Sequence, residues 1–180
     1  MKIILIGIQG SGKSTQGNLL SEKLHIPYLS TGHIFRILSK EHTLLGKQIK
    51  VVMNAGLLIS DEKTLNIVEE YLTRPEYQKG YILDGFPRTL NQANNFKNKI
   101  DKAFYIKISD KEALWRISGR EEGAEVREDE TLMAVRKRIE LFHQVTEPVI
   151  DFYKQKGLLI EINGEKEIEE INKEILEKLQ

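Results

Sequence analysis

The hydrophobic positions of this chain alternate between short apolar runs and longer helical patterns. Residues 3–6 form a wholly apolar run, which is typical of a strand buried on both faces of a parallel sheet. Strands that alternate with helices favour an α/β fold, here three layers around a central five-stranded parallel sheet. The other predicted strands are residues 28–29, 81–84, 103–108 and 158–162.

Apolar residues at helical spacing predict helices between and after these strands. Residues 13–24 follow the first strand as a helix, and residues 168–179 end the chain as another. Residues 132–153 carry a longer helical pattern. Proline lacks the backbone N–H that a helix interior needs, so Pro148 is expected to bend this long helix.

Two segments break the alternation. Residues 30–59 have helical patterns and no convincing strand, which predicts a helical insertion between the second and third strands. Residues 120–130 carry almost no apolar side chains. Such a charge run is usually a solvated loop, and the alternative is a short, mobile lid that carries arginines onto phosphates. The core is then expected to comprise residues 1–29, 60–119 and 131–180.

The composition excludes several classes of site. Twenty-seven basic residues balance 27 acidic ones, so the chain lacks the overall positive field of many nucleic-acid-binding proteins. It has no cysteine, which excludes disulfides, iron–sulfur clusters and cysteine-ligated zinc. No apolar run reaches the ~18 residues of a membrane span, and residues 3–6 are too short for a signal peptide. We therefore expect a cytoplasmic protein that binds neither nucleic acid nor membranes.

A glycine-rich loop follows the first strand directly and opens the first helix. Residues 7–14 read Gly-Ile-Gln-Gly-Ser-Gly-Lys-Ser, which fits the phosphate-loop pattern G-x-x-x-x-G-K-[ST] in full. Its backbone N–H groups and the N terminus of the helix favour the binding of phosphate oxygens. Lys13 would reach the β- and γ-phosphates, and the Ser14 hydroxyl would bind Mg²⁺. The alternative is a strand-to-helix turn without a ligand. The loop indicates a nucleoside triphosphate and leaves the acceptor open.

Asp84 ends a predicted buried strand, where an unpaired carboxylate is costly. It either caps the following turn or holds Mg²⁺ through water, as the acidic residue of other phosphate-loop proteins does. Because the chain has a phosphate loop, we favour Asp84 and Ser14 as the magnesium residues.

Further motifs follow the phosphate loop in a definite order. They are Thr15-Gln16; Ser30-Thr31-Gly32 with Arg36; Leu83-Asp84-Gly85-Phe86-Pro87-Arg88-Thr89 with Gln92; Arg116 with Gly119-Arg120; Arg127; Val135-Arg136-Lys137-Arg138; and Pro148 with Tyr153. Together they resemble the motifs of the adenylate kinases, within the nucleoside monophosphate kinases, nearly from end to end. The resemblance implies reversible transfer from MgATP to AMP to give two ADP, with Mg²⁺ as cofactor. It also implies a core, a monophosphate-binding insertion, a short lid and a monomeric protein.

The resemblance also implies roles for individual residues. Arg36 and Arg88 would hold the AMP phosphate, and no general base is needed because the attacking phosphate oxygen is already anionic. The expected catalytic residues are Lys13, Arg88, Arg116, Arg120, Arg127 and Arg138. The expected ATP contacts are Gly10, Ser11, Gly12, Lys13, Ser14, Thr15, Arg116, Arg120 and Lys166. The expected AMP contacts are Thr31, Arg36, Leu57, Leu58, Ile59, Gly85, Phe86, Pro87, Arg88, Gln92, Arg127 and Arg138.

Base selection is expected at Thr31, Gln92 and residues 57–59. A glutamine amide both donates and accepts, so Gln92 can read the adenine edge. In the related pyrimidine monophosphate kinases an asparagine usually stands near this position, so Gln92 favours AMP. The alternatives are an ordinary exposed helix position for Gln92 and simple packing for residues 57–59. The function classes that remain open beside adenylate kinase are a UMP/CMP kinase and a nucleotide-binding protein with little catalytic activity.

The chain departs from the common adenylate kinase pattern at three places. His33 stands where an aspartate normally follows Ser-Thr-Gly, and Ser14 stands where the family usually has glycine. Only six residues separate Arg120 from Arg127, so the lid is short. His33 either alters how Mg²⁺ is held or simply caps or packs at a helix start.

Overall fold

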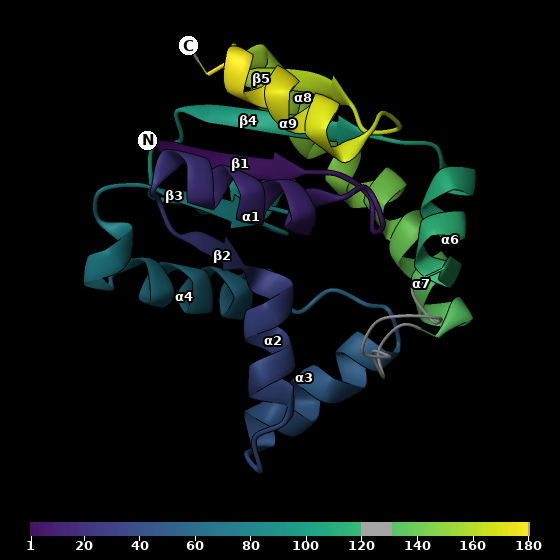
Figure 1. Ribbon diagram of the computed structural model, residues 1–180. Helices are drawn as coiled ribbons and strands as arrows, with labels where there is room; N and C mark the ends of the chain where they lie inside the picture. Colours follow the sequence, from purple (N-terminus) through teal and green to yellow (C-terminus); the bar gives the residue numbers. More distant parts are fainter. Residues whose placement is uncertain (120–130, 180) are drawn as a thin grey trace.

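A computed structural model describes residues 1–119 and 131–179 and has one five-stranded parallel sheet. Its strand order is β2-β3-β1-β4-β5 (Figure 1). Each strand overlaps its predicted range, which confirms the predicted α/β fold. The strands are β1 (Lys2–Ile6), β2 (Tyr28–Ser30), β3 (Tyr81–Asp84), β4 (Lys102–Lys107) and β5 (Leu159–Asn163).

Helices cover both faces of the sheet. Ile3 and Leu5 of β1 pack in the same apolar cluster as residues of α1 (Lys13–Leu24) and α9 (Ile168–Glu177). Figure 1 shows these two helices side by side over one face of the sheet. Successive side chains of a strand point to opposite faces, so β1 contributes its other apolar residues to a second cluster.

The second cluster lies on the opposite face. Ile4 and Ile6 of β1 pack there with residues of α4 (Asp61–Leu72) and α8 (Glu147–Gln155). The short helix α5 (Leu90–Asn95) contributes Ala93 to the same cluster. The molecule therefore has three layers, with β1 buried on both sides, as its apolar run predicts.

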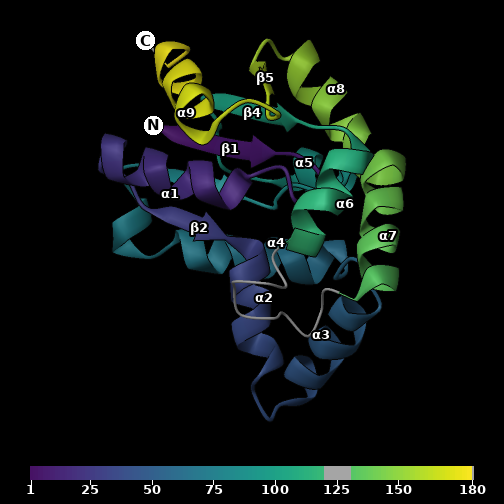
Figure 2. The same cartoon turned by 45° about the vertical axis from the view of Figure 1, so that its right-hand side comes forward.

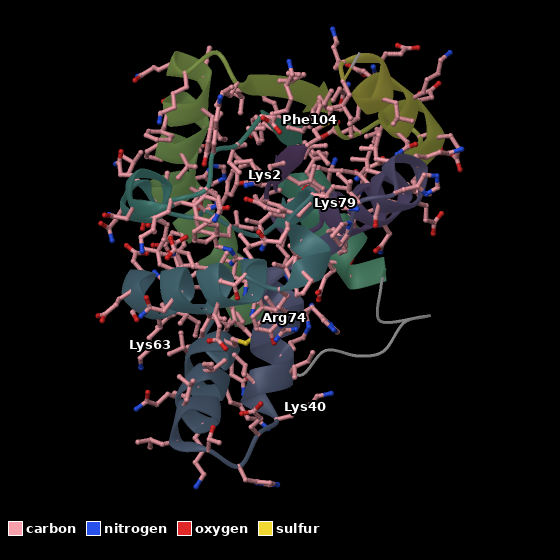
Figure 3. The ribbon with its side chains drawn as sticks, turned by 90° about the vertical axis from the view of Figure 1, so that its left-hand side faces the viewer. Lys2, Lys40, Lys63, Arg74, Lys79 and Phe104 are labelled. Carbon is pink, nitrogen blue, oxygen red and sulfur yellow. The ribbon has the colours of Figure 1, made fainter. Side chains whose placement is uncertain are left out.

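The predicted helical insertion forms α2 (Thr31–Ser39) and α3 (Leu44–Asn54), which extend away from the sheet (Figure 1). The Ser30 hydroxyl accepts a hydrogen bond from the His33 N–H at 3.4 Å and caps α2. Lys63 of α4, labelled in Figure 3, donates to Gln48 Oε1 of α3 at 2.8 Å. This contact uses only the backbone of His33, so both roles expected for its side chain stay predictions.

Two helices stand at one end of the sheet, α6 (Asp110–Ser118) and α7 (Leu132–Leu141) (Figure 2). Within the long helical pattern a π-helical segment, η3 (Phe142–Thr146), separates α7 from α8, and the bend expected at Pro148 stays a prediction. Pro148 lies in the first turn of α8, where a missing N–H costs no intrahelical bond. A short 3₁₀ turn, η1 (Pro75–Tyr77), follows α4. None of the helices in the described ranges is both long and apolar enough to span a membrane.

His143 in η3 connects two helices through its imidazole ring. Its Nδ1 lies 2.6 Å from Glu147 Oε1, and its Nε2 lies 2.9 Å from Asp110 Oδ1. The hydrogen bond to Glu147, above all, and the neighbouring Asp110 raise the pKa of His143. Because the folded-state pKa lies above the unfolded-state value, this stabilisation is complete below the unfolded pKa of about 6.5 and is lost as pH rises through the folded pKa.

We predict that His143→Gln lowers stability in acid and has little effect in base. The imidazole is largely exposed, so solvent screening limits the loss to about 0.5 kcal/mol, or ~1–2 °C in the unfolding midpoint. Thermal unfolding well below and well above the pKa of histidine measures this difference. His42→Gln, in the exposed loop after α2, is the control. Equal destabilisation by His143→Gln at both pH values would contradict the assignment.

Candidate active site

The parallel pairing of β1 with β3 places two predicted motifs next to each other. Leu5 lies opposite Asp84, so the loop after β1 and the segment after β3 leave the sheet at the same edge. A cavity opens there. Of the predicted site residues, those that line it are Gly10, Gly12, Lys13, Ser14, Thr15, Arg36, Leu57, Leu58, Ile59, Asp84, Gly85, Phe86, Pro87, Arg88, Gln92 and Arg138.

The phosphate loop curls around the ammonium group of Lys13. Lys13 Nζ donates to the carbonyl oxygens of Gly7 and Ile8 at 2.8 and 2.9 Å. Ser11 is buried and its N–H donates to Ile8 O at 3.1 Å, which closes the turn. The N-cap residue of α1 is Gly12, which has no side chain to cap the helix, and such a terminus is an anion site. The loop therefore presents N–H groups and one cation to the cavity.

Asp84 has one oxygen paired and one oxygen unpaired. Its Oδ2 accepts from Tyr28 Oη at 2.7 Å and from Ser14 Oγ at 3.3 Å. Its Oδ1 is buried and has no hydrogen-bond partner among the described residues. An unpaired buried carboxylate oxygen is costly, so this atom is suited to accept from a water molecule that a metal ion holds.

Tyr28 is a site residue that the sequence pattern did not reveal. Burial, and the negative charge of Asp84, raise its pKa, so the phenol stays protonated and donates to the carboxylate. A Cβ atom at Gly17 would overlap the Tyr28 ring, so the glycine leaves room for it. Gly17, a glycine inside a helical pattern, is a sequence signal that could have indicated such a close approach.

Gly85 forms the bend that follows β3. Its φ of +80° belongs to the left-handed region, and its carbonyl accepts from Thr31 Oγ1 at 2.9 Å and Arg88 Nε at 2.8 Å. The Phe86–Pro87 peptide after it is cis. The hydroxyl of Thr31 is thus engaged by the backbone, and Thr31 is not among the lining residues, so its predicted base contact stays a prediction.

Three arginines from separate parts of the chain converge on the cavity: Arg36 of α2, Arg88 after β3 and Arg138 of α7. Arg138 donates to Met53 O at 3.0 Å and to Gln9 Oε1 at 3.3 Å, which fixes its position. Burial, and the adjacent charges of Arg138 and Arg36, lower the pKa of Arg88, whereas Asp84 acts against this shift. Like charges repel at short range, so this cluster is favourable with an anion such as phosphate between its members.

Gln92 is buried, which excludes the alternative of an ordinary exposed helix position. Its Oε1 accepts from the Arg88 N–H at 2.7 Å, and its Nε2 donates to Asp61 Oδ1 at 2.8 Å. It lines the cavity together with Leu57, Leu58 and Ile59.

Several predicted residues do not line this cavity. Arg116 donates through Nε to Glu112 Oε1 at 2.6 Å, and Lys166 donates to Glu174 Oε2 at 2.7 Å. Neither residue lines the cavity, so their predicted contacts with ATP stay predictions. Arg120, Arg127 and the predicted lid at residues 120–130 lie outside the described residues. His33 is exposed and also lies outside the lining set.

The structure adds lining residues to which the sequence analysis gave no individual role. Thr146 of η3 donates through Oγ1 to Arg88 O at 2.9 Å and so supports the position of that residue. Met53 of α3 and Gln9 of the loop both accept from Arg138. Their roles depend on contacts between distant elements, and residue spacing along the chain does not predict such contacts.

Comparisons with known proteins agree with this arrangement. The family model described as adenylate kinase matches residues 5–158. The chain belongs to the adenylate kinase family. A relative named adenylate kinase from Caldicellulosiruptor bescii is 38% identical, with 99% of each chain covered. Another of that name, from Stenotrophomonas maltophilia, is 40% identical, with 98% of this chain and 97% of the relative covered. A third, from Methanocella arvoryzae, is 34% identical over 97% of this chain and 96% of its own. The adenylate kinase fold and family expected from the motifs are therefore confirmed.

We predict that Gly85→Ala weakens AMP binding. An alanine Cβ would lie 2.6 Å from Thr31 Oγ1 and 3.1 Å from Arg88 Nη2 at a strained positive φ, so the arginine must move. The dissociation constant for AMP should rise about tenfold, which corresponds to ~1.4 kcal/mol. Calorimetric titration with AMP measures it. Gly157→Ala is the matched control, because its φ is also positive and no described residue would lie within 4 Å of its Cβ. Unchanged AMP affinity in a folded Gly85→Ala protein would contradict the predicted role of this bend.

Proposed function

We propose that this protein transfers the γ-phosphoryl group of MgATP to AMP, reversibly, to give two ADP, and that the residues of the cavity carry out this transfer. One observation carries the proposal: the phosphate loop with Lys13 and the cluster of Arg36, Arg88 and Arg138 line the same cavity. One cationic loop suits a triphosphate, and a second, separate cationic cluster suits the phosphate of an acceptor.

The two nucleotides would enter from different sides of this cavity. The ATP phosphates bind the N–H groups of the loop and Lys13. The AMP phosphate binds Arg36 and Arg88, and Arg138 lies where both phosphates can be reached. The adenine of AMP then lies toward Gln92 and the apolar side chains of Leu57, Leu58 and Ile59, which line the same cavity.

The transfer needs positioning and charge neutralisation rather than a protein base. An oxygen of the AMP phosphate attacks the γ-phosphorus as the bond from that phosphorus to the β–γ bridging oxygen breaks, and ADP is formed on both sides. The cationic groups of Lys13, Arg88 and Arg138 offset the negative charge that is shared among the transferring oxygens. A guanidinium keeps its proton throughout and can hold two phosphate oxygens at once.

Ser14 at the start of α1 and Asp84 at the end of β3 fit a magnesium ion. Ser14 offers a hydroxyl oxygen, and Asp84 offers a buried carboxylate oxygen without a partner among the described residues. Mg²⁺ prefers oxygen ligands of this kind. When bound, the ion neutralises phosphate charge. Ser14 and Asp84 would hold it, Asp84 through water, while Tyr28 keeps the carboxylate in place. The residue after Gly32 is a histidine, so this position supplies no carboxylate here. His33 also does not line the cavity.

We predict that Lys13→Met lowers turnover on the order of 10²–10³-fold, the usual effect of removing one preorganised electrostatic contact. The fold should survive, because Lys13 bonds the loop's own carbonyls and is not a core residue. A coupled assay with MgATP and AMP measures the rate. Lys107→Met, which removes an exposed cation from β4, is the matched control. Near-normal turnover of Lys13→Met would show that the loop does not act on the transferring phosphate.

The proposed acceptor is tested with a panel of monophosphates. AMP should exceed UMP by at least about tenfold in kcat/KM, because reading one polar edge of the base is worth more than ~1.4 kcal/mol. It should exceed CMP by a similar factor, because the smaller pyrimidine ring makes less apolar contact with Leu57, Leu58 and Ile59. The coupled assay with each monophosphate at fixed MgATP gives the ratio. Equal use of CMP or UMP would favour the pyrimidine monophosphate kinase instead. Tight nucleotide binding without turnover would favour a binding protein.

A further inference from the structure

We propose that Asp61 is a positioning residue that sets which bases the acceptor site takes, because it fixes the orientation of the Gln92 side-chain amide. The inference rests on the proposed function, in which Gln92 faces the base of the acceptor nucleotide. Asp61 is the first residue of α4 and lies 31 positions before Gln92 in the sequence.

Two protein groups determine which end of the Gln92 amide is oxygen. The backbone N–H of Arg88 can only donate, and it lies 2.7 Å from Oε1. A carboxylate can only accept, and Oδ1 of Asp61 lies 2.8 Å from Nε2. A reversed amide would bring two donors together at Arg88 and two acceptors together at Asp61. The buried amide therefore has one favourable orientation, and Asp61 fixes its nitrogen end.

Asp61 is itself held by the segment that it orients. Its Oδ1 also accepts from Thr89 Oγ1 at 2.9 Å, and its Oδ2 accepts from Asn91 Nδ2 at 3.0 Å. Its position in the first turn of α4 favours a negative charge. The carboxylate thus has donors on both oxygens and little freedom to turn away from Gln92.

The fixed amide gives the cavity an ordered pair of hydrogen-bonding groups. After its contacts with Arg88 and Asp61, the amide has one N–H and one oxygen lone pair that bond no other described residue. A base that carries an amino group beside an acceptor ring nitrogen, such as adenine or cytosine, matches this order. A base with an oxo group beside a ring N–H, such as hypoxanthine, guanine or uracil, opposes it at both positions.

The prediction is therefore a preference for 6-amino over 6-oxo purine monophosphates that depends on Asp61. AMP and IMP are the sharpest pair, because they differ only at position 6 and in the proton on the adjacent ring nitrogen. Asp61→Ala removes the acceptor for Nε2 and leaves the Arg88 N–H as the one group of the pair that opposes a reversed amide, so reversal to suit an oxo base becomes easier. The AMP-to-IMP ratio of kcat/KM should fall about tenfold, as expected for loss of a hydrogen bond to a charged group.

Three further variants separate positioning from a structural role. Asp61→Asn keeps an oxygen that can accept from Gln92. Its new amide nitrogen would face Asn91, whose exposed amide can turn so that its oxygen accepts, so most of the AMP-to-IMP ratio should be recovered. In Asp61→Ser the new side chain suits the first turn of a helix but is too short to reach Gln92. This variant replaces Asp61→Ala in the test if Asp61→Ala does not fold. Glu62→Ala removes the neighbouring exposed charge of α4 and should leave the ratio unchanged.

The experiment measures kcat and KM for AMP and for IMP at saturating MgATP, with thermal unfolding of each variant. A lower ratio in Asp61→Ala or Asp61→Ser, recovered in Asp61→Asn, supports the inference. An unchanged ratio in folded Asp61→Ala and Asp61→Ser, even with both substrates slowed equally, would overturn it and leave a structural role for Asp61. If the unaltered protein does not prefer AMP to IMP, the proposed acceptor site itself is wrong.

Discussion

The site depends on the parallel pairing of β1 with β3, in which Leu5 lies opposite Asp84. The two strands are adjacent at the centre of the sheet, and both end at the same edge. The phosphate loop and the bend at Gly85 therefore begin side by side, although more than seventy residues separate them along the chain. Apolar packing on both faces of β1 keeps this register, because a shift would move its side chains to the wrong layers. The groups that we propose to be catalytic are thus positioned by the core of the fold.

The charge distribution supports the proposal that this edge of the sheet binds nucleotides. Arg36, Arg88 and Arg138 come from three different elements and face one cavity together with Lys13. Asp84 is the nearby carboxylate, and one of its oxygens is paired with neutral hydroxyl groups. The lowered pKa of Arg88 reflects its burial and the adjacent guanidinium groups. Such an arrangement is unfavourable alone and is stabilised by bound phosphate, which is the requirement of a phosphotransferase.

The sequence predicted the framework well because local patterns determine it. The apolar run of β1, the glycines of the loop and the motif after β3 are continuous segments, and the structure confirms their places. Contacts between distant segments were harder to foresee. Tyr28 and Asp61 act through partners 56 and 31 residues away, and neither belongs to a recognised motif. Arg116 matched a motif and Lys166 was expected from the resemblance, but the structure pairs them with acidic neighbours outside the cavity. Spacing identifies which residue types are present, whereas burial and side-chain partners determine which of them face a ligand.

The central claim is that the arginine cluster is a phosphate site for the acceptor nucleotide. The most direct test is a calorimetric comparison of AMP with adenosine, which has the same base and ribose and no phosphate. With charge-assisted hydrogen bonds of about 1.5–3 kcal/mol each, AMP should bind on the order of 10²–10³-fold more tightly, and this advantage should shrink as salt is added. Equal affinities for AMP and adenosine would contradict the account, because the cluster of three guanidinium groups would then not hold the phosphate.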